Sequence, residues 1–242
     1  MTAIRIENLT KRYKDITAVD NLSLEIAEGE LFSLLGVNGA GKTTTIKMLS
    51  CLTLPTSGDA TVLGESITKN PTAVKAIIGV SPQETAVAAG LTVRENLELI
   101  CGIYGFDKEK TAAKVSALSS MLSLDGVINK KASKLSGGYA RRLSIAMALI
   151  SEPKILFLDE PTLGLDVIAR SELWDIIRSL KGKVTIILTT HYMEEAEALS
   201  DRIAIMKDGK LLVCDTPDAI KAQTNEDSIE KSFIKIVKGE PK

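Results

Sequence analysis

A glycine-rich segment, residues 36–44 with the sequence GVNGAGKTT, carries the strongest chemical signal in the chain. It matches the pattern G-x-x-x-x-G-K-[ST] and directly follows an uninterrupted apolar run, Leu31–Leu35. Glycines let successive backbone N–H groups point inward, and the start of a helix adds partial positive charge. We therefore predict a phosphate-binding loop in which Lys42 neutralises the β and γ phosphates and the Thr43 hydroxyl binds Mg²⁺.

Two carboxylates, Asp159 and Glu160, come directly after a second short apolar run, Ile155–Leu158. Sheets of α/β proteins bind ligands at the carboxyl ends of their strands, and this run would deliver both carboxylates to such an edge. We predict that Asp159 holds the metal and that Glu160 orients and polarises the attacking water. A solvated acidic turn is the alternative interpretation, and the phosphate-binding loop earlier in the chain makes it the weaker one.

The composition narrows the class of protein. The 242 residues include 30 Lys and Arg against 31 Asp and Glu, a net charge of −1 that argues against a dedicated nucleic-acid or membrane-surface binder. One histidine, His191, excludes a metal site built from several histidines. The three cysteines, Cys51, Cys101 and Cys214, lack CxxC spacing, so we expect reduced thiols in a cytosol. The longest apolar runs fall far below the ~20 residues of a membrane span.

The apolar patterning predicts an α/β fold. Apolar and polar residues alternate over residues 4–6 and 22–26, which indicates N-terminal strands, and Leu31–Leu35 reads as a central buried strand. A helix is expected over Lys42–Leu52, directly after the phosphate-binding loop. A second small β region is expected around Ala60–Leu63.

A helical subdomain is expected to interrupt this α/β pattern over about residues 84–150. Thr92 and Glu95 form a capping-box pattern, Asp107 can cap a second helix, and a third helix is expected to begin near Ser136. The second helix is expected to turn inward the apolar residues Ala112, Val115, Leu118 and Leu122.

The α/β pattern resumes after this insert. A helix over residues 168–181 and a strand over residues 184–189 are predicted, and Asp208-Gly209 lies between two apolar runs, which is a hairpin signal. Thr216 and Pro217 open a short helical tail over about residues 217–242. We expect residues 1–242 to form a single domain.

The motif Leu135-Ser136-Gly137-Gly138-Tyr139, taken with the phosphate-binding loop before it and the two carboxylates after it, resembles the ATP-binding cassette (ABC) ATPases. The motifs occur in that family's order, and the resemblance covers about residues 1–225. It implies a P-loop NTPase with a RecA-like core, an N-terminal antiparallel β subdomain and an inserted helical subdomain. Ser136, Gly137 and Gly138 would start a helix with exposed amides, which is a second anion-binding site. The resemblance implies that this signature loop binds ATP held by the other subunit of a head-to-tail dimer.

The resemblance also assigns roles to single positions. Tyr13 lies where the family has an aromatic ring that stacks on adenine, and Val19 where an apolar residue backs the ring and ribose. Gln83 looks like the glutamine that touches Mg²⁺ and the attacking water, Asp166 would communicate across the dimer, and His191 would contact the γ-phosphate. The residues expected to bind ATP are Tyr13, Val19, Asn38, Gly39, Ala40, Gly41, Lys42, Thr43 and Thr44.

Two features depart from the family pattern or lie outside it. Tyr139 stands where Gln is commonest, and we assign it no essential role. Basic side chains flank the signature loop, and we interpret them as a solvated helical face. These residues are Lys130, Lys131, Lys134, Arg141 and Arg142.

The resemblance implies an ATP hydrolase that uses ATP and Mg²⁺ and whose sites are completed when two cassettes dimerise, as a homodimer or a heterodimer. Residues 191–217 and the short tail look most like the ATP-binding subunits of bacterial drug, sodium or polysaccharide exporters. The partner would be a membrane-embedded permease on a separate chain, with no nucleic acid involved. The chain would be cytoplasmic and peripheral at the inner face of the cell membrane.

Two other functions remain open at this point. A soluble ABC ATPase that does not transport, for example of the iron–sulfur assembly type, has a compatible length. A P-loop module that binds nucleotide without turnover is disfavoured by the presence of both Glu160 and His191.

Overall fold

The computed structural model describes residues 1–239, so positions 240–242 of the predicted tail lie outside the described residues. The chain divides into two compact units. The first unit combines Met1–Ala76 with the segment from Lys181 onward, and the second is Ile77–Leu180. Within residues 1–239, no helix combines the length and the apolar character that crossing a bilayer requires.

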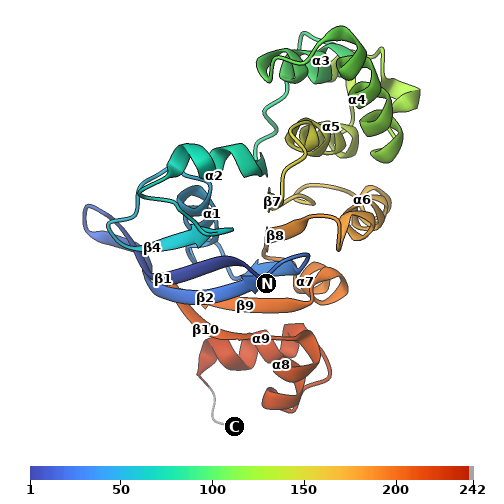
Figure 1. Ribbon diagram of the computed structural model, residues 1–242. Helices are drawn as coiled ribbons and strands as arrows, with labels where there is room; N and C mark the ends of the chain where they lie inside the picture. Colours follow the sequence, from blue (N-terminus) through green and yellow to red (C-terminus); the bar gives the residue numbers. More distant parts are fainter. Residues whose placement is uncertain (240–242) are drawn as a thin grey trace. The chain divides into compact units, whose positions relative to one another are not determined.

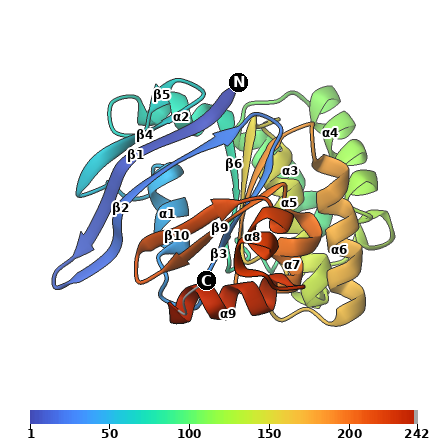
Figure 2. The same ribbon diagram turned by 90° about the horizontal axis from the view of Figure 1, so that it is seen from below.

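An antiparallel sheet forms the N-terminal part of the first unit (Figure 1). Its strands are β1 (Thr2–Tyr13), β2 (Ile16–Ala27), β4 (Ser57–Val62) and β5 (Glu65–Ser66), in the order β2-β1-β4-β5. The long hairpin of β1 and β2 is visible along its whole length in Figure 2. The predicted alternation is confirmed over residues 4–6 and 22–26, where the apolar residues are buried and the polar residues between them are exposed.

A second group of strands in the first unit carries the phosphate-binding loop. Strand β3 (Leu31–Leu35) pairs in parallel with β8 (Thr185–Thr190) on one side and β9 (Arg202–Lys207) on the other. Strand β10 (Lys210–Asp215) pairs antiparallel with β9 through the predicted turn at Asp208-Gly209, where both residues have positive φ. Every residue of β3 and β8 is buried, as expected for central parallel strands.

The helices of the first unit are shorter than those of the second. They are α1 (Lys42–Leu49), α2 (Pro71–Ile77), α7 (Met193–Leu199), α8 (Pro217–Thr224) and α9 (Ile229–Lys238). The last residue of α2, Ile77, already belongs to the second unit.

The predicted extension of the first helix to Leu52 is wrong. Helix α1 ends at Leu49, and Ser50 is its C-cap. Cys51 adopts a left-handed backbone with a φ of 56°, which a continuing α-helix does not allow.

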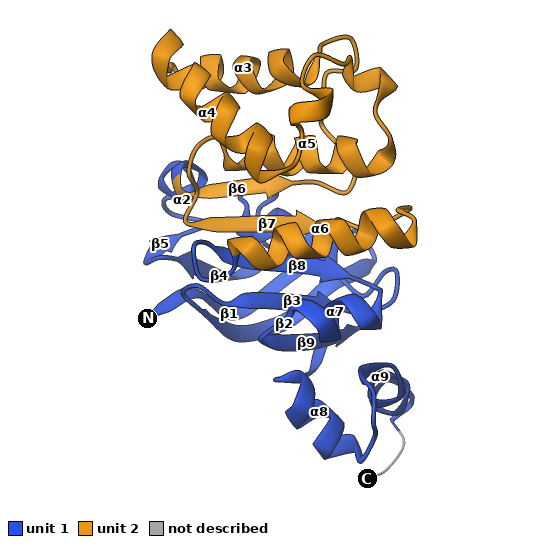
Figure 3. Cartoon of the chain, turned by 90° about the vertical axis from the view of Figure 1, so that its right-hand side faces the viewer, with its two compact units in different colours: residues 1–76, 181–242 blue, residues 77–180 orange. Residues whose placement is uncertain are grey.

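The second unit contains two parallel strands and four helices of ten or more residues (Figure 3). Strand β6 (Ile78–Ser81) pairs with β7 (Ile155–Asp159), and Ser81 lies opposite Leu158 in the register. The helices are α3 (Val93–Ile103), α4 (Lys108–Met121), α5 (Gly137–Leu149) and α6 (Val167–Leu180), with short 3₁₀ turns at η1 (Asp125–Val127) and η2 (Ala132–Lys134).

The predicted helix starts of this unit are confirmed. Thr92 and Glu95 form a complete capping box at α3, and the Asp107 side chain accepts from the Lys110 N–H at α4. The predicted inward face of α4 is wrong at one position, because Ala112 is exposed and Ser119 is buried instead. The Ser119 hydroxyl donates to the Asp125 carboxylate, so a polar side chain is accommodated there.

Candidate phosphate-binding and catalytic site

The phosphate-binding loop lies between β3 and α1 in the first unit. Gly39 has a φ of 84° and Gly41 a φ of 102°, so both use backbone conformations that L-residues rarely adopt. Val37, Asn38 and Gly39 are exposed, while Ala40 is buried and its N–H donates to the Val37 carbonyl over 3.1 Å. No side chain caps α1 at Gly41, so the start of this helix is open to an anionic ligand.

Lys42 lies inside the loop that precedes it. The residue is only 5% exposed, and its ammonium Nζ donates to the carbonyl of Gly36 over 2.8 Å and to that of Val37 over 3.2 Å. The loop therefore wraps around the ammonium group and fixes its position. Because the side chain of Lys42 is already ordered in the folded protein, binding of a ligand at the loop does not add the entropy cost of ordering it.

Backbone from β2 and from the β9–β10 turn lies against the phosphate-binding loop, and no pattern in the sequence predicted these contacts. A Cβ atom on Gly41 would lie 2.4 Å from the Ala18 carbonyl oxygen, so β2 passes directly against the loop. The Gly209 N–H donates to the Ala40 carbonyl over 3.2 Å, and the Gly209 carbonyl accepts from the Asp20 N–H over 2.8 Å. The hairpin turn itself was predictable, but its contact with the phosphate-binding loop depends on the tertiary fold.

The two residues predicted to contact the base differ in exposure. Tyr13 at the end of β1 is 44% exposed, and the Lys11 ammonium lies 5.0 Å from its ring centroid. An exposed ring of this kind fits a stacking role. Val19 is fully buried, and a Cβ on Gly41 would lie 3.3 Å from its Cγ2, so Val19 supports the loop and offers no surface to a ligand in this structure. Ala18 carries the partly exposed side chain at this point.

His191 directly follows β8, the strand that pairs with β3. Leu35 lies opposite Thr190 in this register, and the Gly36 N–H donates to the Thr190 carbonyl over 3.4 Å. The first residue of the phosphate-binding loop and the residue before His191 are therefore hydrogen-bonded neighbours. The His191 ring is partly buried, and its centroid lies 4.2 Å from that of Tyr192.

Asp159 and Glu160 lie at the carboxyl end of β7 in the second unit. Their residues are only 5% and 7% exposed, so neither is the solvated acidic turn that was the alternative interpretation. Glu160 has a left-handed backbone with a φ of 47°.

The signature loop starts helix α5. Ser136 is its N-cap, but the Ser136 side chain makes no capping hydrogen bond. Ser136 and Gly137 are exposed, whereas Gly138 is buried. A helix start that its own cap residue leaves uncapped suits the binding of an anion, as the sequence predicted.

Two of the basic residues near the signature loop are not on a solvated face, so that prediction is wrong for Arg141 and Arg142. The Arg141 guanidinium donates to the carbonyls of Pro82 and Gln83, both over 2.6 Å, and the residue is 5% exposed. Helix α5 thereby fixes the backbone of Gln83, one of the predicted metal-site residues. The sequence could not indicate this, because the acceptors are main-chain carbonyls nearly sixty positions away.

Arg142 is buried for a different reason. Its guanidinium forms an ion pair with Glu172 of α6 and lies 5.3 Å from the ring centroid of Tyr139. Tyr139, the departure from the family's usual Gln, therefore contacts Arg142 within the same helix.

The loop after Glu160 leads to α6. The Asp166 carboxylate accepts from the Ala169 N–H over 2.9 Å and so caps the start of this helix. Thr162 is fully buried, and its hydroxyl has no hydrogen-bond partner among the described residues. Asp166 itself is exposed, so its predicted role across a dimer remains compatible with its local role.

The predicted site residues therefore fall into two sets, one in each unit. Tyr13, Val19, the loop and His191 belong to the first unit. Gln83, the signature loop, the two carboxylates and Asp166 belong to the second. The side chains predicted to hold Mg²⁺, from Thr43, Gln83 and Asp159, offer hydroxyl, amide and carboxylate oxygens, which is the donor chemistry that Mg²⁺ takes.

The sequence of this chain also matches a known protein family. A family model described as "ABC transporter" matches residues 19–163. The "Probable multidrug ABC transporter ATP-binding protein YbhF" of Escherichia coli (strain K12) is 39% identical, over 98% of this chain and 42% of that protein. The "Daunorubicin resistance ATP-binding protein DrrA3" of Streptomyces coeruleorubidus is 41% identical, over 95% of this chain and 73% of that protein. The chain thus spans less than half of the first relative's length.

Two similar solved structures are also described as an ATP-binding subunit or an ATP-binding cassette. One, described as "Structure of ATP binding subunit of ABC transporter", has a TM-score of 0.86 and 26% identity, covering 98% of this chain and all of the other. A second, described as "Dimeric structure of a post-hydrolysis state of the ATP-binding cassette MJ0796 bound to ADP and Pi", has a TM-score of 0.79 and 29% identity. It covers 88% of this chain and 98% of that one. The predicted cassette fold is confirmed.

Proposed function

This chain belongs to the ABC transporter family, and we propose that it is the ATP-hydrolysing subunit of an exporter whose membrane-spanning permease is a separate chain. The phosphate-binding loop carries the proposal. Its two left-handed glycines, Gly39 and Gly41, give the backbone a concave shape around the buried ammonium of Lys42. Such a loop at an uncapped helix start binds the phosphates of a nucleotide.

The chain's own residues divide the work of binding. Loop amides and Lys42 would bind the β and γ phosphates of ATP, and Tyr13 would stack on the adenine ring. Thr43, Gln83 and Asp159 would hold Mg²⁺. When bound, Mg²⁺ would offset the negative charge of the phosphates.

Hydrolysis would then be the attack of water on the γ-phosphorus. Glu160 would orient this water and accept its proton, while the bond between the γ-phosphorus and the β–γ bridging oxygen breaks and ADP leaves. His191, at the end of β8, would hydrogen-bond the γ-phosphate and hold it in line with the water. The products are ADP and inorganic phosphate.

Two cassettes would complete each other's sites. The uncapped start of α5 at Ser136 would bind the γ-phosphate of ATP held in the loop of a second cassette, identical or related. The description of one similar structure as dimeric, with ADP and Pi bound, supports this arrangement. ATP binding would join the cassettes and hydrolysis would release them, so that nucleotide turnover becomes motion.

Export is supported by the relatives, whose names refer to multidrug transport and to daunorubicin resistance. The name of one relative, an ATP-binding protein of a transporter, supports a permease that is a separate chain. The chain would then work in the cytoplasm, bound to the inner face of the membrane through its permease.

Replacement of one carboxylate tests the hydrolytic part of the proposal. Glu160→Gln should lower ATP turnover by about 10²- to 10⁴-fold while nucleotide binding persists, because the general base is lost and the phosphate-binding loop is intact. Glu28→Gln, in the exposed turn between β2 and β3, is the matched control and should keep wild-type turnover. We expect the Glu160→Gln protein, and not the control, to elute as a dimer with ATP and Mg²⁺. Wild-type turnover in Glu160→Gln would remove the proposed base.

Purification from solubilised membranes tests the transport part. A tagged copy of the chain should co-purify with a membrane-spanning protein, in an amount that increases with the Glu160→Gln variant and ATP. Recovery of soluble iron–sulfur assembly proteins alone would instead favour the non-transport alternative.

A further inference from the structure

One side chain on α7 contacts both helices of the C-terminal tail. The Glu197 Oε1 accepts from the Lys221 ammonium on α8 over 2.9 Å, and its Oε2 accepts from the Ile229 N–H at the start of α9 over 3.2 Å. Glu197 therefore caps α9 from another helix and pairs with α8 at the same time. The hydrogen bond to Glu197, followed by that to Asp218, raises the pKa of Lys221.

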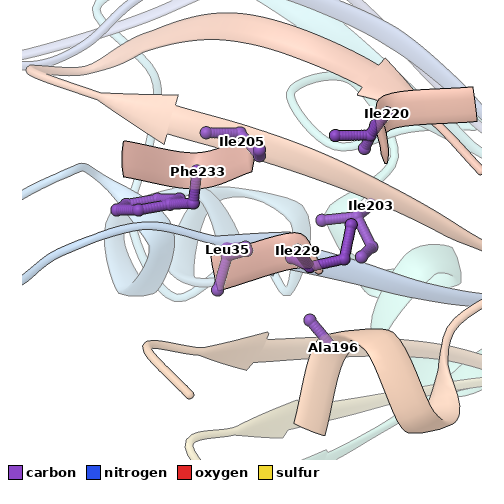
Figure 4. Packing of buried hydrophobic residues seen from close by; sticks show 7 residues of the cluster. All are labelled: Leu35, Ala196, Ile203, Ile205, Ile220, Ile229 and Phe233. Atoms are coloured by element: carbon purple, nitrogen blue, oxygen red, sulfur yellow. The ribbon is translucent and has the colours of Figure 1, made fainter. Parts of the chain in front are cut away.

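An apolar cluster lies under these polar contacts (Figure 4). It joins the tail helices to α7, to β9 and to the end of β3. Its buried members are Leu35, Ala196, Ile203, Ile205, Ile220, Ile229 and Phe233. The tail is thus seated on the same elements that carry the phosphate-binding loop and His191.

The chain connects this cluster directly to the site. Leu35 immediately precedes the phosphate-binding loop, and it lies opposite Thr190, the residue before His191. Ala196 lies on α7, which begins at Met193, only two residues after His191. His191 is therefore held between β8 on one side and α7 on the other, and the tail helices contact α7.

Further polar contacts hold the two tail helices against β9 and against each other. The Lys207 ammonium at the end of β9 donates to the Val237 carbonyl of α9 over 2.8 Å. The hydroxyls of Thr224 and Ser232 join α8 to α9 over 2.8 Å. Contacts at both ends of α9 make the helix pair one docked body, so a shift of the pair would move α7.

We propose that Glu197 is a positioning residue that fixes α7 through the docked tail helices and thereby sets the position of His191. The inference rests on the proposed role of His191 in ATP hydrolysis. Small displacements of a catalytic group away from the reacting atoms can cost up to about 10²-fold in rate. Loss of the Glu197 contacts should therefore lower turnover and leave the phosphate-binding loop able to bind nucleotide.

The single histidine provides a readout that does not depend on turnover. Protein labelled with [¹³C]histidine gives one imidazole signal, which belongs to His191. In nucleotide-free protein, Glu197→Ala should shift this signal, and Glu230→Ala, an exposed carboxylate on α9, should leave it unchanged. Glu197→Gln keeps an oxygen that can accept from the Ile229 N–H and should bring the signal back toward the wild-type position. An unmoved signal in Glu197→Ala would overturn the inference.

A double-mutant cycle tests whether Glu197 acts through His191. Glu197→Ala should lower kcat about tenfold or more with little change in the Kd for a fluorescent ATP analogue, and Glu230→Ala should change neither. In a His191→Ala background, Glu197→Ala should cause no further loss, because residues that act through one another are not additive. Full additivity, or equal loss of binding and turnover, would overturn the positioning role. If instead His191→Ala turns over ATP at the wild-type rate, the proposed role of His191 fails first, and the imidazole signal still reports whether Glu197 positions the ring.

Discussion

Substitution of Gly41 by Ala should destabilise the nucleotide-free protein more than the same change at Gly39. Both residues have positive φ, so both variants place an L-residue in a strained left-handed backbone. The two positions differ in the space available to an added Cβ atom. A Cβ on Gly39 would meet no atom within 4 Å, whereas a Cβ on Gly41 would lie 2.4 Å from the Ala18 carbonyl oxygen. The pair therefore separates backbone strain from the clash with β2.

The expected magnitudes follow from these two terms. A left-handed L-residue costs about 1–2 kcal/mol, and the reduced freedom of the unfolded chain returns about 0.4–1 kcal/mol when Gly becomes Ala. Gly39→Ala should thus lose about 1 kcal/mol of unfolding free energy. Gly41→Ala adds an overpacking cost of about 1–3 kcal/mol, because a main-chain oxygen cannot rotate away. The difference between the variants should be about 2 kcal/mol.

Thermal and urea unfolding without nucleotide measure this difference. For a chain of this length, about 2 kcal/mol corresponds to a Tm lower by about 4–8 °C in Gly41→Ala than in Gly39→Ala. Gly105→Ala, with a φ of 70° and open space at its Cβ, is a control outside the phosphate-binding loop and should resemble Gly39→Ala in stability. It should also bind ATP like the wild type. Equal Tm values for Gly41→Ala and Gly39→Ala would refute the argument that β2 confines the loop.

Three further outcomes are expected. Arg141→Lys should lower both ATP turnover and Tm, because a lysine cannot donate to both carbonyls at Pro82 and Gln83 in the fixed geometry of a guanidinium; steady-state kinetics and a melting curve check this. Phe233→Ala should lower the unfolding free energy by about 3–5 kcal/mol in urea titrations, since it empties a buried site under the tail. The backbone N–H of Thr92, followed by its side chain, donates to the Glu95 carboxylate and lowers the pKa of Glu95 below its ordinary 4.5. The ionised Glu95 therefore stabilises the folded protein above pH 4.5, and this stabilisation is lost as the pH falls through the lowered pKa of the folded state. The stability difference between wild type and Glu95→Gln should therefore shrink in unfolding curves recorded at successively lower pH below 4.5.

Local sequence patterns predicted the features that depend on near neighbours in the chain. The capping box of Thr92 and Glu95 needs only four consecutive residues, and the turn at Asp208-Gly209 needs only two left-handed positions. The phosphate-binding loop belongs to the same class, because its glycines, its lysine and the strand before it are contiguous. These features could be located to within a residue or two from the sequence.

The unpredicted features depend on partners far along the chain. Strand β6 has only four residues, which are too few to show an alternating pattern in the sequence. It forms by pairing with β7, more than seventy positions later in the chain. Arg141 was predicted to be a solvated charge because its acceptors are main-chain carbonyls. Every residue has such a carbonyl, so no sequence pattern indicates which of them will accept a hydrogen bond. Val19 shows the converse, since an apolar residue near the loop matched a ligand-contact position and proved to be fully buried beneath it.

The support of the phosphate-binding loop also explains how a chain with a net charge of −1 could bind an anion as highly charged as ATP. The Ala18 carbonyl lies close against Gly41, the Gly209 N–H donates to the Ala40 carbonyl, and the Lys42 ammonium donates to carbonyls of the loop, so the loop has a defined shape before a ligand arrives. A preorganised loop spends little binding energy on its own ordering. Its attraction is also local, because amides and one buried ammonium act at contact distance, whereas a field from a strongly basic surface would be screened over about 8 Å at physiological salt. Nucleotide affinity should consequently depend only weakly on ionic strength, and a steep decrease of affinity with added salt, measured with a fluorescent ATP analogue, would contradict this account of the site.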